Sequence, residues 1–285
     1  MFAEVNGVKL YFDVEGAGLV ADGPLVRAKP TVVLLHGGPG FDHTIYKPAF
    51  SALADVAQIV YLDHRGNGRS AGSDPATWNL AQWGDDVRGL CDALGIDKPI
   101  VYGASFGGFV AQSYATRHPD HPAKLVLAST AARVEFEIVF EAFDRIGGPG
   151  ARQVAEAYWL NPTAESRARY FEVCLPLYRP HPPENDHVRR RGIIKNDVAL
   201  HFNGPGNEHG RMDFRAALRD VRCPVLVLAG ELDPVTPVPF SETIAACLPP
   251  HLVRFERFAG CGHGVVPDDP ERVFAVLRAF IENGA

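Results

Sequence analysis

The sequence predicts an α/β fold built on a mostly parallel sheet with helices on both faces. Three short apolar runs, 31–35, 58–62 and 100–102, lack the polar alternation of half-exposed strands, so we expect strands buried on both faces. Apolar residues recur at helical spacing over 79–95, with Gly95 at the end as a cap. This alternation of strands and helices is typical of a doubly wound sheet with right-handed crossovers.

Length and composition bound the possible functions. The 285 residues suit one large domain with an inserted subdomain, and 46% hydrophobic residues are enough for a full core. A net charge of -6 indicates no nucleic-acid or membrane partner, and no apolar stretch is long enough to cross a bilayer. The N-terminus lacks signal-peptide regions, and five scattered cysteines form no zinc spacing. We therefore expect a cytoplasmic protein with free thiols, no metal and no cofactor.

The remaining elements follow in chain order. Residues 2–15 alternate around Asn6-Gly7, which predicts an antiparallel hairpin at one edge of the sheet, and 16–30 is expected to be a surface loop. Residues 44–54 are moderately helical. Further strands and helices are predicted at the following ranges: a helix to about 118, strand 124–129, strand 224–229, helix 238–247, strand 253–258 and helix 270–281.

The pattern changes between residues 132 and 218, where no buried strand is expected. Helical spacing recurs near 135–145, 150–159 and 163–175, and prolines then interrupt it. We predict a helical lid at 132–218, inserted between two parts of one core, 1–131 and 219–285. Most of its aromatic residues should form the lid's own core, while a few line a pocket under it. The pocket candidates are Gly37, Phe140, Tyr158 and Trp159.

The strand at 100–102 runs into Gly103-Ala104-Ser105-Phe106-Gly107, and a helix-forming run follows. Strand, sharp turn and helix are the setting of a nucleophile elbow, in which the serine is strained and its neighbours must be small. The N-terminus of the helix would favour negative charge near the serine oxygen. The alternative is a glycine-rich turn with an incidental serine.

Two partners for Ser105 follow along the chain, Asp233 and His263, each at or just beyond the end of a predicted strand. The ends of parallel strands share one edge of a sheet, so the three side chains can meet as a nucleophile, a base and an orienting carboxylate. Taken alone, Asp233 could instead cap the next helix, and His263 could be a loop histidine among glycines. Together with the elbow, they favour a catalytic triad.

Attack on an ester or amide creates an oxyanion, which needs two backbone N–H donors. We expect one donor at Phe106, directly after the serine, and the other at Gly38 in the turn after the first central strand. A phosphate-binding loop is the competing interpretation of the glycines at 37–40. It lacks the Gly-Lys-Ser/Thr sequence, and Pro39 has no N–H to donate.

Five segments together resemble the motif set of the α/β-hydrolase superfamily, and within it the proline iminopeptidase branch. They are His36-Gly-Gly-Pro-Gly40, Asp63-His-Arg-Gly-Asn-Gly-Arg-Ser70, Gly103-Ala-Ser-Phe-Gly-Gly108, Gly230-Glu-Leu-Asp233 and Gly262-His263. The resemblance covers nearly the whole chain apart from the lid. It implies triad roles for Ser105, Asp233 and His263, oxyanion roles for Gly38 and Phe106, and structural roles for Asp63 and Arg65.

The chain also departs from that branch. Its aminopeptidases bind a terminal amine with lid carboxylates and often with one after the triad aspartate, where this chain has Pro234. The elbow has Ala104 and Phe106 where the branch commonly has Gly and Trp or Tyr. The first hypothesis is therefore a serine hydrolase acting on a small acyl substrate, an ester or lactone. The second is a prolyl aminopeptidase acting on short peptides, and the third is a non-catalytic ligand-binding protein on the same scaffold.

Overall fold

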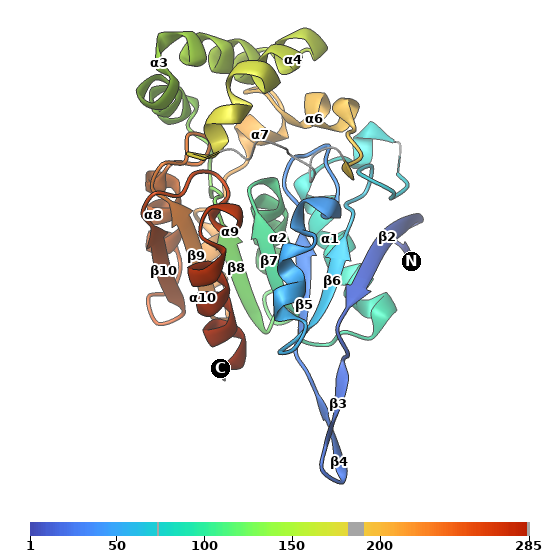
Figure 1. The fold of residues 1–285 in the computed structure, drawn as a ribbon. Helices are drawn as coiled ribbons and strands as arrows, with labels where there is room; N and C mark the ends of the chain where they lie inside the picture. Colours follow the sequence, from blue (N-terminus) through green and yellow to red (C-terminus); the bar gives the residue numbers. More distant parts are fainter. Residues whose placement is uncertain (73, 182–190, 284–285) are drawn as a thin grey trace.

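The computed structural model describes residues 1–72, 74–181 and 191–283. Within them, an eight-stranded sheet forms the centre of the molecule (Figure 1). The strands lie in the order β1 (Phe2–Val5), β2 (Val8–Glu15), β6 (Gln58–Leu62), β5 (Thr31–Leu35), β7 (Ile100–Ala104), β8 (Lys124–Ala128), β9 (Val225–Gly230) and β10 (Val253–Phe258). β2 pairs antiparallel with β1 and β6, and the pairs from β6 to β10 are parallel. The predicted mostly parallel α/β sheet is confirmed.

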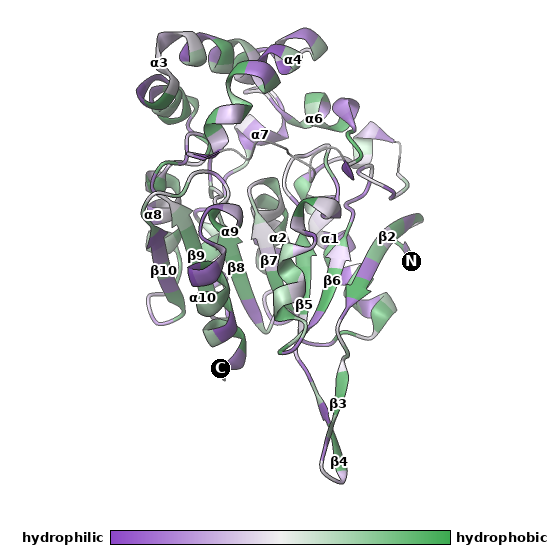
Figure 2. Cartoon of the chain, in the orientation of Figure 1, coloured by the Kyte–Doolittle hydropathy of each residue, from purple (hydrophilic) through white to green (hydrophobic). Residues whose placement is uncertain are grey.

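Helices cover both faces of the sheet, because successive residues of the central strands are apolar and point to opposite sides. Val33 and Leu35 of β5 pack in a core with α1 (Leu80–Leu94), α2 (Phe106–Arg117) and α8 (Val238–Cys247). Val32 and Leu34 of the same strand face the other side of the sheet. They pack with α10 (Pro270–Glu282) and two 3-10 helices, η1 (His43–Tyr46) and η2 (Ala49–Leu53). The central strands are accordingly hydrophobic along their length in Figure 2.

The N-terminal hairpin forms as predicted, with Asn6 and Gly7 at positive φ between β1 and β2. The expected loop at 16–30 is wrong in part, since it contains a second hairpin, β3 (Leu19–Asp22) and β4 (Leu25–Ala28). This hairpin extends from the end of the sheet away from the segment predicted as a lid (Figure 1). Leu19, Leu25 and Val26 of this hairpin are exposed, and the short strands lie between glycines and a proline, so the sequence pattern indicated a loop.

The segment predicted as a lid is helical where the structure describes it, and residues 182–190 lie outside that description. Gly148, at φ 74 and ψ -178, breaks α3 (Phe136–Leu160) into the two helical stretches expected from the sequence. The other elements here are α4 (Ala164–Val173), η4 (Leu175–Tyr178), α6 (Asn196–Phe202), α7 (Glu208–Arg211) and η5 (Ala217–Asp220). Helices α3, α4, α6 and α7 lie over one end of the sheet (Figure 1). The short η3 (Pro75–Thr77) and α9 (Val265–Asp268) complete the described elements.

The cysteine side chains are mostly buried. All five cysteines are free, as predicted. Burial raises the pKa of Cys91, Cys174 and Cys223 to about 12, so these groups stay protonated at neutral pH. None of the helices in the described part of the chain is both long enough and apolar enough to cross a bilayer.

Candidate active site

The turn between β7 and α2 holds Ser105 in a conformation that side-chain-bearing residues rarely adopt, with φ 54 and ψ -120. Backbone and side-chain contacts fix it there. The Ser105 N–H donates to the carbonyl of Ala128 at 3.0 Å, and the Ser105 carbonyl accepts from Thr130 Oγ1 at 2.8 Å. The turn therefore has the geometry of a nucleophile elbow, with the serine at the carboxyl end of a central strand.

Glycines around Ser105 leave no room for side chains. A Cβ at Gly107 would lie 1.9 Å from the carbonyl oxygen of Leu35, and one at Gly103 would lie 2.2 Å from that of Gly107. At Gly108, a Cβ would come within 2.5 Å of Thr130 Oγ1. The close approach of α2 to the strands beneath it thus depends on all three glycines.

The structure brings Ser105, His263 and Asp233 together. Nε2 of His263 lies 2.9 Å from Ser105 Oγ, and its Nδ1 lies 2.9 and 3.0 Å from the two carboxylate oxygens of Asp233. Asp233 is 1% exposed. A base within hydrogen-bond reach of a hydroxyl, oriented by a buried carboxylate, is the arrangement that activates a serine.

The surroundings of Asp233 favour its charged form. Burial by itself raises its pKa, but the electrostatic interaction and hydrogen bond with His263, together with hydrogen bonds from Thr236, bring the pKa below its usual value. Oδ1 accepts from the N–H groups of Val235 and Thr236, and Oδ2 accepts from Thr236 Oγ1, each at 2.8 Å. Since Pro237, not Asp233, precedes α8 as its cap residue, the helix-cap alternative does not hold.

The loop that carries His263 is held in part by the predicted lid. The His263 N–H donates to the carbonyl of Tyr178 at 2.7 Å, and the Tyr178 ring meets the imidazole edge-on at 4.9 Å. A Cβ at Gly262 would lie 2.2 Å from that same carbonyl. Tyr178 lies in the segment predicted as a lid, and this contact, which the sequence pattern does not indicate, joins that segment to the candidate base.

The two predicted oxyanion donors come from neighbouring strands. β5 lies between β6 and β7, where the chain order reverses, and open α/β sheets bind ligands at such a crevice. Gly38, at φ 128 in the turn after β5, borders the same cavity as Ser105. Phe106 is the first residue of α2, so its N–H has no acceptor within the helix. Its ring is apolar and fully buried, so the backbone N–H is the group that Phe106 can offer as a donor.

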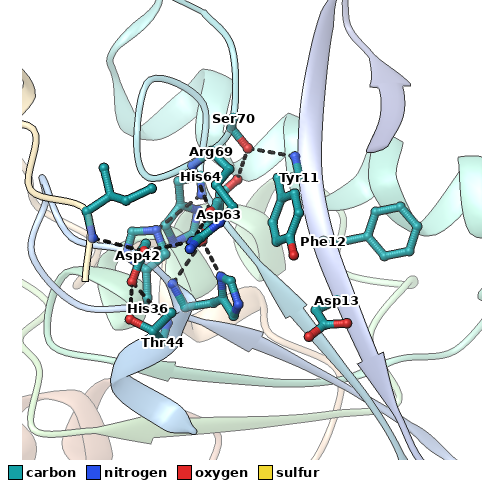
Figure 3. Close-up of polar contacts among 12 residues, drawn as sticks. Tyr11, Phe12, Asp13, His36, Asp42, Thr44, Asp63, His64, Arg69 and Ser70 are labelled. Atoms are coloured by element: carbon teal, nitrogen blue, oxygen red, sulfur yellow. Dashed lines mark hydrogen bonds and ion pairs between the residues drawn. The ribbon is translucent and has the colours of Figure 1, made fainter. Parts of the chain in front are cut away.

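Buried polar side chains hold the loop after β5 in place (Figure 3). Asp63 accepts hydrogen bonds from the N–H and the Nδ1 of His43 at 2.8 and 2.7 Å, and from the N–H of Arg69 at 2.8 Å. Asp42 accepts from Thr44, from Arg69 and from the N–H of Ile193 at 3.0 Å. This agrees with the structural role that the resemblance implied for Asp63.

A cavity lies between Ser105 and the predicted lid. Its lining residues share an apolar or uncharged character: Gly38, Ser105, Phe109, Val134, Phe136, Val139, Trp159, Phe202, Asn203, His209, Val235 and Thr236. The cavity volume is about 20 Å³, which is room for about one water molecule. This volume is smaller than the space that a small organic ligand occupies.

Of the four predicted pocket residues, the cavity lining includes Trp159 but not Gly37, Phe140 or Tyr158. Phe140 is buried and stacks on Phe136 at 6.3 Å, one layer behind the lining. Tyr158 is also buried, and its hydroxyl accepts from Asn203 Nδ2 at 2.7 Å. An ideal Cβ at Gly37 would lie 3.5 Å from Ser105 Cβ, so Gly37 packs against the serine outside the cavity lining.

Comparison with known proteins decides the family. The family model described as the alpha/beta hydrolase fold matches residues 30–270. The chain belongs to the α/β hydrolase family. "Putative carbamate hydrolase RutD" of Caulobacter vibrioides (strain NA1000 / CB15N) is 30% identical over 282 residues, covering 96% of this chain and 95% of that protein. "Proline iminopeptidase PfmaB" of Pestalotiopsis fici is 38% identical over 133 residues, covering 46% of this chain and 43% of that protein.

Solved structures resemble this α/β hydrolase over its whole length. A thermophilic esterase from Thermogutta terrifontis superimposes with a TM-score of 0.72 at 26% identity, covering 99% of this chain and 97% of that one. The proline iminopeptidase of Mycobacterium smegmatis gives 0.77 at 22% identity with the same coverage. The superfamily membership predicted from the five sequence motifs is confirmed.

Several residues line the cavity of this hydrolase although the sequence did not indicate them as site residues, above all His209, Asn203 and Thr236. Thr236 follows Asp233 in Asp-Pro-Val-Thr, a spacing that favours local hydrogen bonds to the aspartate. The sequence pattern could therefore have indicated that Thr236 lies next to Asp233. His209 and Asn203 had no such signal, because they lie among glycines and prolines without a helical pattern. Burial lowers the pKa of His209 to about 3, so its imidazole is neutral at physiological pH.

Proposed function

We propose that this α/β hydrolase cleaves small neutral acyl substrates, esters or lactones, through an acyl-enzyme on Ser105. The observation that carries the proposal is the continuous set of hydrogen bonds from Ser105 Oγ through His263 to Asp233, with the serine strained at the end of β7. Such a hydroxyl is a usable nucleophile because its proton has an oriented acceptor.

The reaction follows from these positions. Ser105 Oγ attacks the substrate carbonyl while His263 Nε2 takes the hydroxyl proton, and the N–H groups of Gly38 and Phe106 stabilise the oxyanion. The C–O bond to the leaving group then breaks, and His263 returns the proton to the departing alcohol. Water next attacks the acyl-enzyme, giving its proton to His263. The carboxylic acid leaves as Ser105 regains its hydrogen.

The cavity supports a neutral substrate. Among the described residues that line it, none is Asp, Glu, Lys or Arg. A charged ammonium, such as the terminal amine of a prolyl peptide, would lose its hydration there without a carboxylate to pair with. This argues against the prolyl aminopeptidase alternative, although the partial match to PfmaB keeps it as a comparison. The match to RutD over 96% of the chain makes a carbamate ester the second candidate, since its carbonyl can be attacked in the same way.

A substrate panel tests the proposal. Hydrolysis rates for p-nitrophenyl butyrate, a small lactone, an aryl carbamate and prolyl p-nitroanilide should rank with the ester or lactone first and the prolyl amide last. Ser105→Ala serves as the control for background reaction. A fluorophosphonate probe should label Ser105 in the wild-type protein. If the probe does not label it and no substrate turns over, the chain is the ligand-binding alternative, and dominant prolyl amide cleavage would reverse the ranking.

A further inference from the structure

His209, in the short helix α7, lines the cavity that also contains Ser105. The imidazole is enclosed by four aromatic rings: Trp159 at 5.0 Å, Phe136 at 5.4 Å, Phe202 at 5.6 Å and Phe109 at 5.9 Å between ring centroids. The residue is 6% exposed. A titratable ring therefore lies buried among four aromatic side chains, which needs a reason beyond packing.

One nitrogen of this ring is unsatisfied. Nδ1 of His209 is buried and has no hydrogen-bond partner among the described residues. Burial of an unpaired polar atom costs free energy, and such atoms are few in folded proteins. Since the ring is neutral, it carries one N–H donor and one nitrogen that accepts. A group that can both donate and accept would therefore complete it best.

A second polar group borders the same space. Asn203 is 4% exposed and lines the cavity, and its Nδ2 donates to the hydroxyl of Tyr158 at 2.7 Å. This contact directs the amide nitrogen toward Tyr158 and leaves the carbonyl oxygen as a hydrogen-bond acceptor. The buried imidazole and this amide oxygen together present donor and acceptor capacity without net charge.

We propose that His209 and Asn203 bind a hydroxyl group on the acyl chain, so that the hydrolase prefers hydroxyacyl esters to unsubstituted ones. This inference depends on the proposed serine hydrolysis at Ser105. A hydroxyl matches the two residues because it donates and accepts at once. A carboxylate or ammonium would be stripped of water among four aromatic rings with no charged lining residue in the described part of the chain. An alkyl chain would leave the imidazole nitrogen unpaired.

Matched esters provide the test. The kcat/KM of p-nitrophenyl butyrate is compared with that of the α-hydroxybutyrate and β-hydroxybutyrate esters, which place the hydroxyl on successive carbons. We expect wild type to prefer at least one hydroxy ester by roughly tenfold or more, because a site built around a hydroxyl rejects an analogue that lacks it. His209→Phe keeps an aromatic ring but removes the nitrogens. It should reduce the preference, measured as the ratio of the kcat/KM values of the hydroxy ester and of butyrate in the same variant, to about one.

Two further variants separate binding from general damage. His209→Gln, which retains a donor and an acceptor, should keep part of the preference. His121 is another buried histidine, and its Nε2 has no partner among the described residues. Its Nδ1 pairs with the Tyr114 hydroxyl in the last turns of α2, and the residue does not line the cavity. His121→Phe should therefore leave the preference unchanged.

Equal kcat/KM for all three esters in wild type would overturn the inference without any variant, and so would a preference that survives His209→Phe. In either case ester turnover itself would still support the proposed function. If wild type hydrolyses none of the esters and Ser105 resists the fluorophosphonate probe, the proposed function fails, and the inference fails with it.

Discussion

The turn that carries Ser105, at the carboxyl end of β7, and the helical segment above it differ in how tightly their backbones are packed. Around the turn, positions are fixed by backbone contacts so close that Gly103, Gly107 and Gly108 cannot carry a side chain. In the helical segment, Gly148 and Gly150 of α3 have no atom within 4 Å of where a Cβ would stand. The first region fixes the backbone around Ser105 and the second borders the cavity. Under the proposed function, we therefore expect substitutions in the two regions to separate chemistry from specificity.

The largest effect should come from removing the nucleophile. Ser105→Ala should lower kcat/KM by about 10⁵-fold or more, because the triad acts as a unit. The free energy of unfolding should change little, since alanine has the same Cβ and is as strained as serine at this positive φ, and only one hydroxyl is removed. Steady-state hydrolysis of p-nitrophenyl butyrate with urea unfolding as the control measures both. Turnover within tenfold of wild type would contradict the assignment.

A matched pair of helical glycines tests the contrast in packing. Gly107→Ala in α2 should lower the free energy of unfolding by about 4 kcal/mol or prevent folding, because the new Cβ would meet the Leu35 carbonyl at 1.9 Å. Gly150→Ala in α3 has open space and should raise it by about 0.5–1 kcal/mol. Urea denaturation of both variants is the measurement, and similar costs at the two positions would contradict the contrast.

The polar network below the loop after β5 should make stability depend on pH. Burial raises the pKa of Asp63, but hydrogen bonds from His43 and from backbone N–H groups bring it below its ordinary value of 3.8. The stability that this carboxylate contributes is therefore present above pH 3.8 and lost as pH falls through the lower folded-state pKa. Asp63→Asn should cost about 2–3 kcal/mol at neutral pH.

Thermal unfolding from neutral pH down to about pH 2 should then show a shallower acid decline for Asp63→Asn than for wild type. The exposed Asp120→Asn, whose partner Arg222 is also exposed, is the matched control and should reproduce the wild-type curve. If the thermal stability of Asp63→Asn and of wild type declined in parallel with falling pH, Asp63 would not be the source of the pH-dependent stability.

The smallest effect should be at Thr236, which we expect to position Asp233 and not to touch substrate carbonyl atoms. Thr236→Val removes the hydroxyl that donates to Asp233 Oδ2 and lies 3.3 Å from His263 Nδ1. We expect kcat to fall by roughly tenfold with KM nearly unchanged, and Thr236→Ser to restore most of it. An unchanged kcat, or a loss confined to KM, would contradict a positioning role.

The same contrast explains what could be predicted from the sequence. The strands and the places of Ser105, Asp233 and His263 follow from uninterrupted apolar runs and from the rule that parallel strands end at one edge. Such reasoning needs no knowledge of tertiary neighbours. The short β3–β4 hairpin escaped it, because two four-residue strands flanked by glycines carry too little pattern.

The cavity lining could not be predicted in the same way. The sequence analysis named Phe140 and Tyr158 as pocket residues, but both are buried outside the cavity lining, because an apolar ring in a helix can face either a core or a cavity. That depends on how the helices dock onto the sheet, which is a tertiary property. His209 and Asn203 lie in a segment without periodicity, so packing alone revealed them.

The hairpin of β3 and β4 also has a practical consequence. It leaves the body of the molecule at the end opposite the helices over Ser105, and its tip at Gly23 has open space around it (Figure 1). Leu25 and Val26 beside the tip are 70% and 68% exposed. A peptide tag or a surface linker inserted at this tip would immobilise the protein with its reaction centre directed outward, free to exchange substrate and product with the surrounding solution.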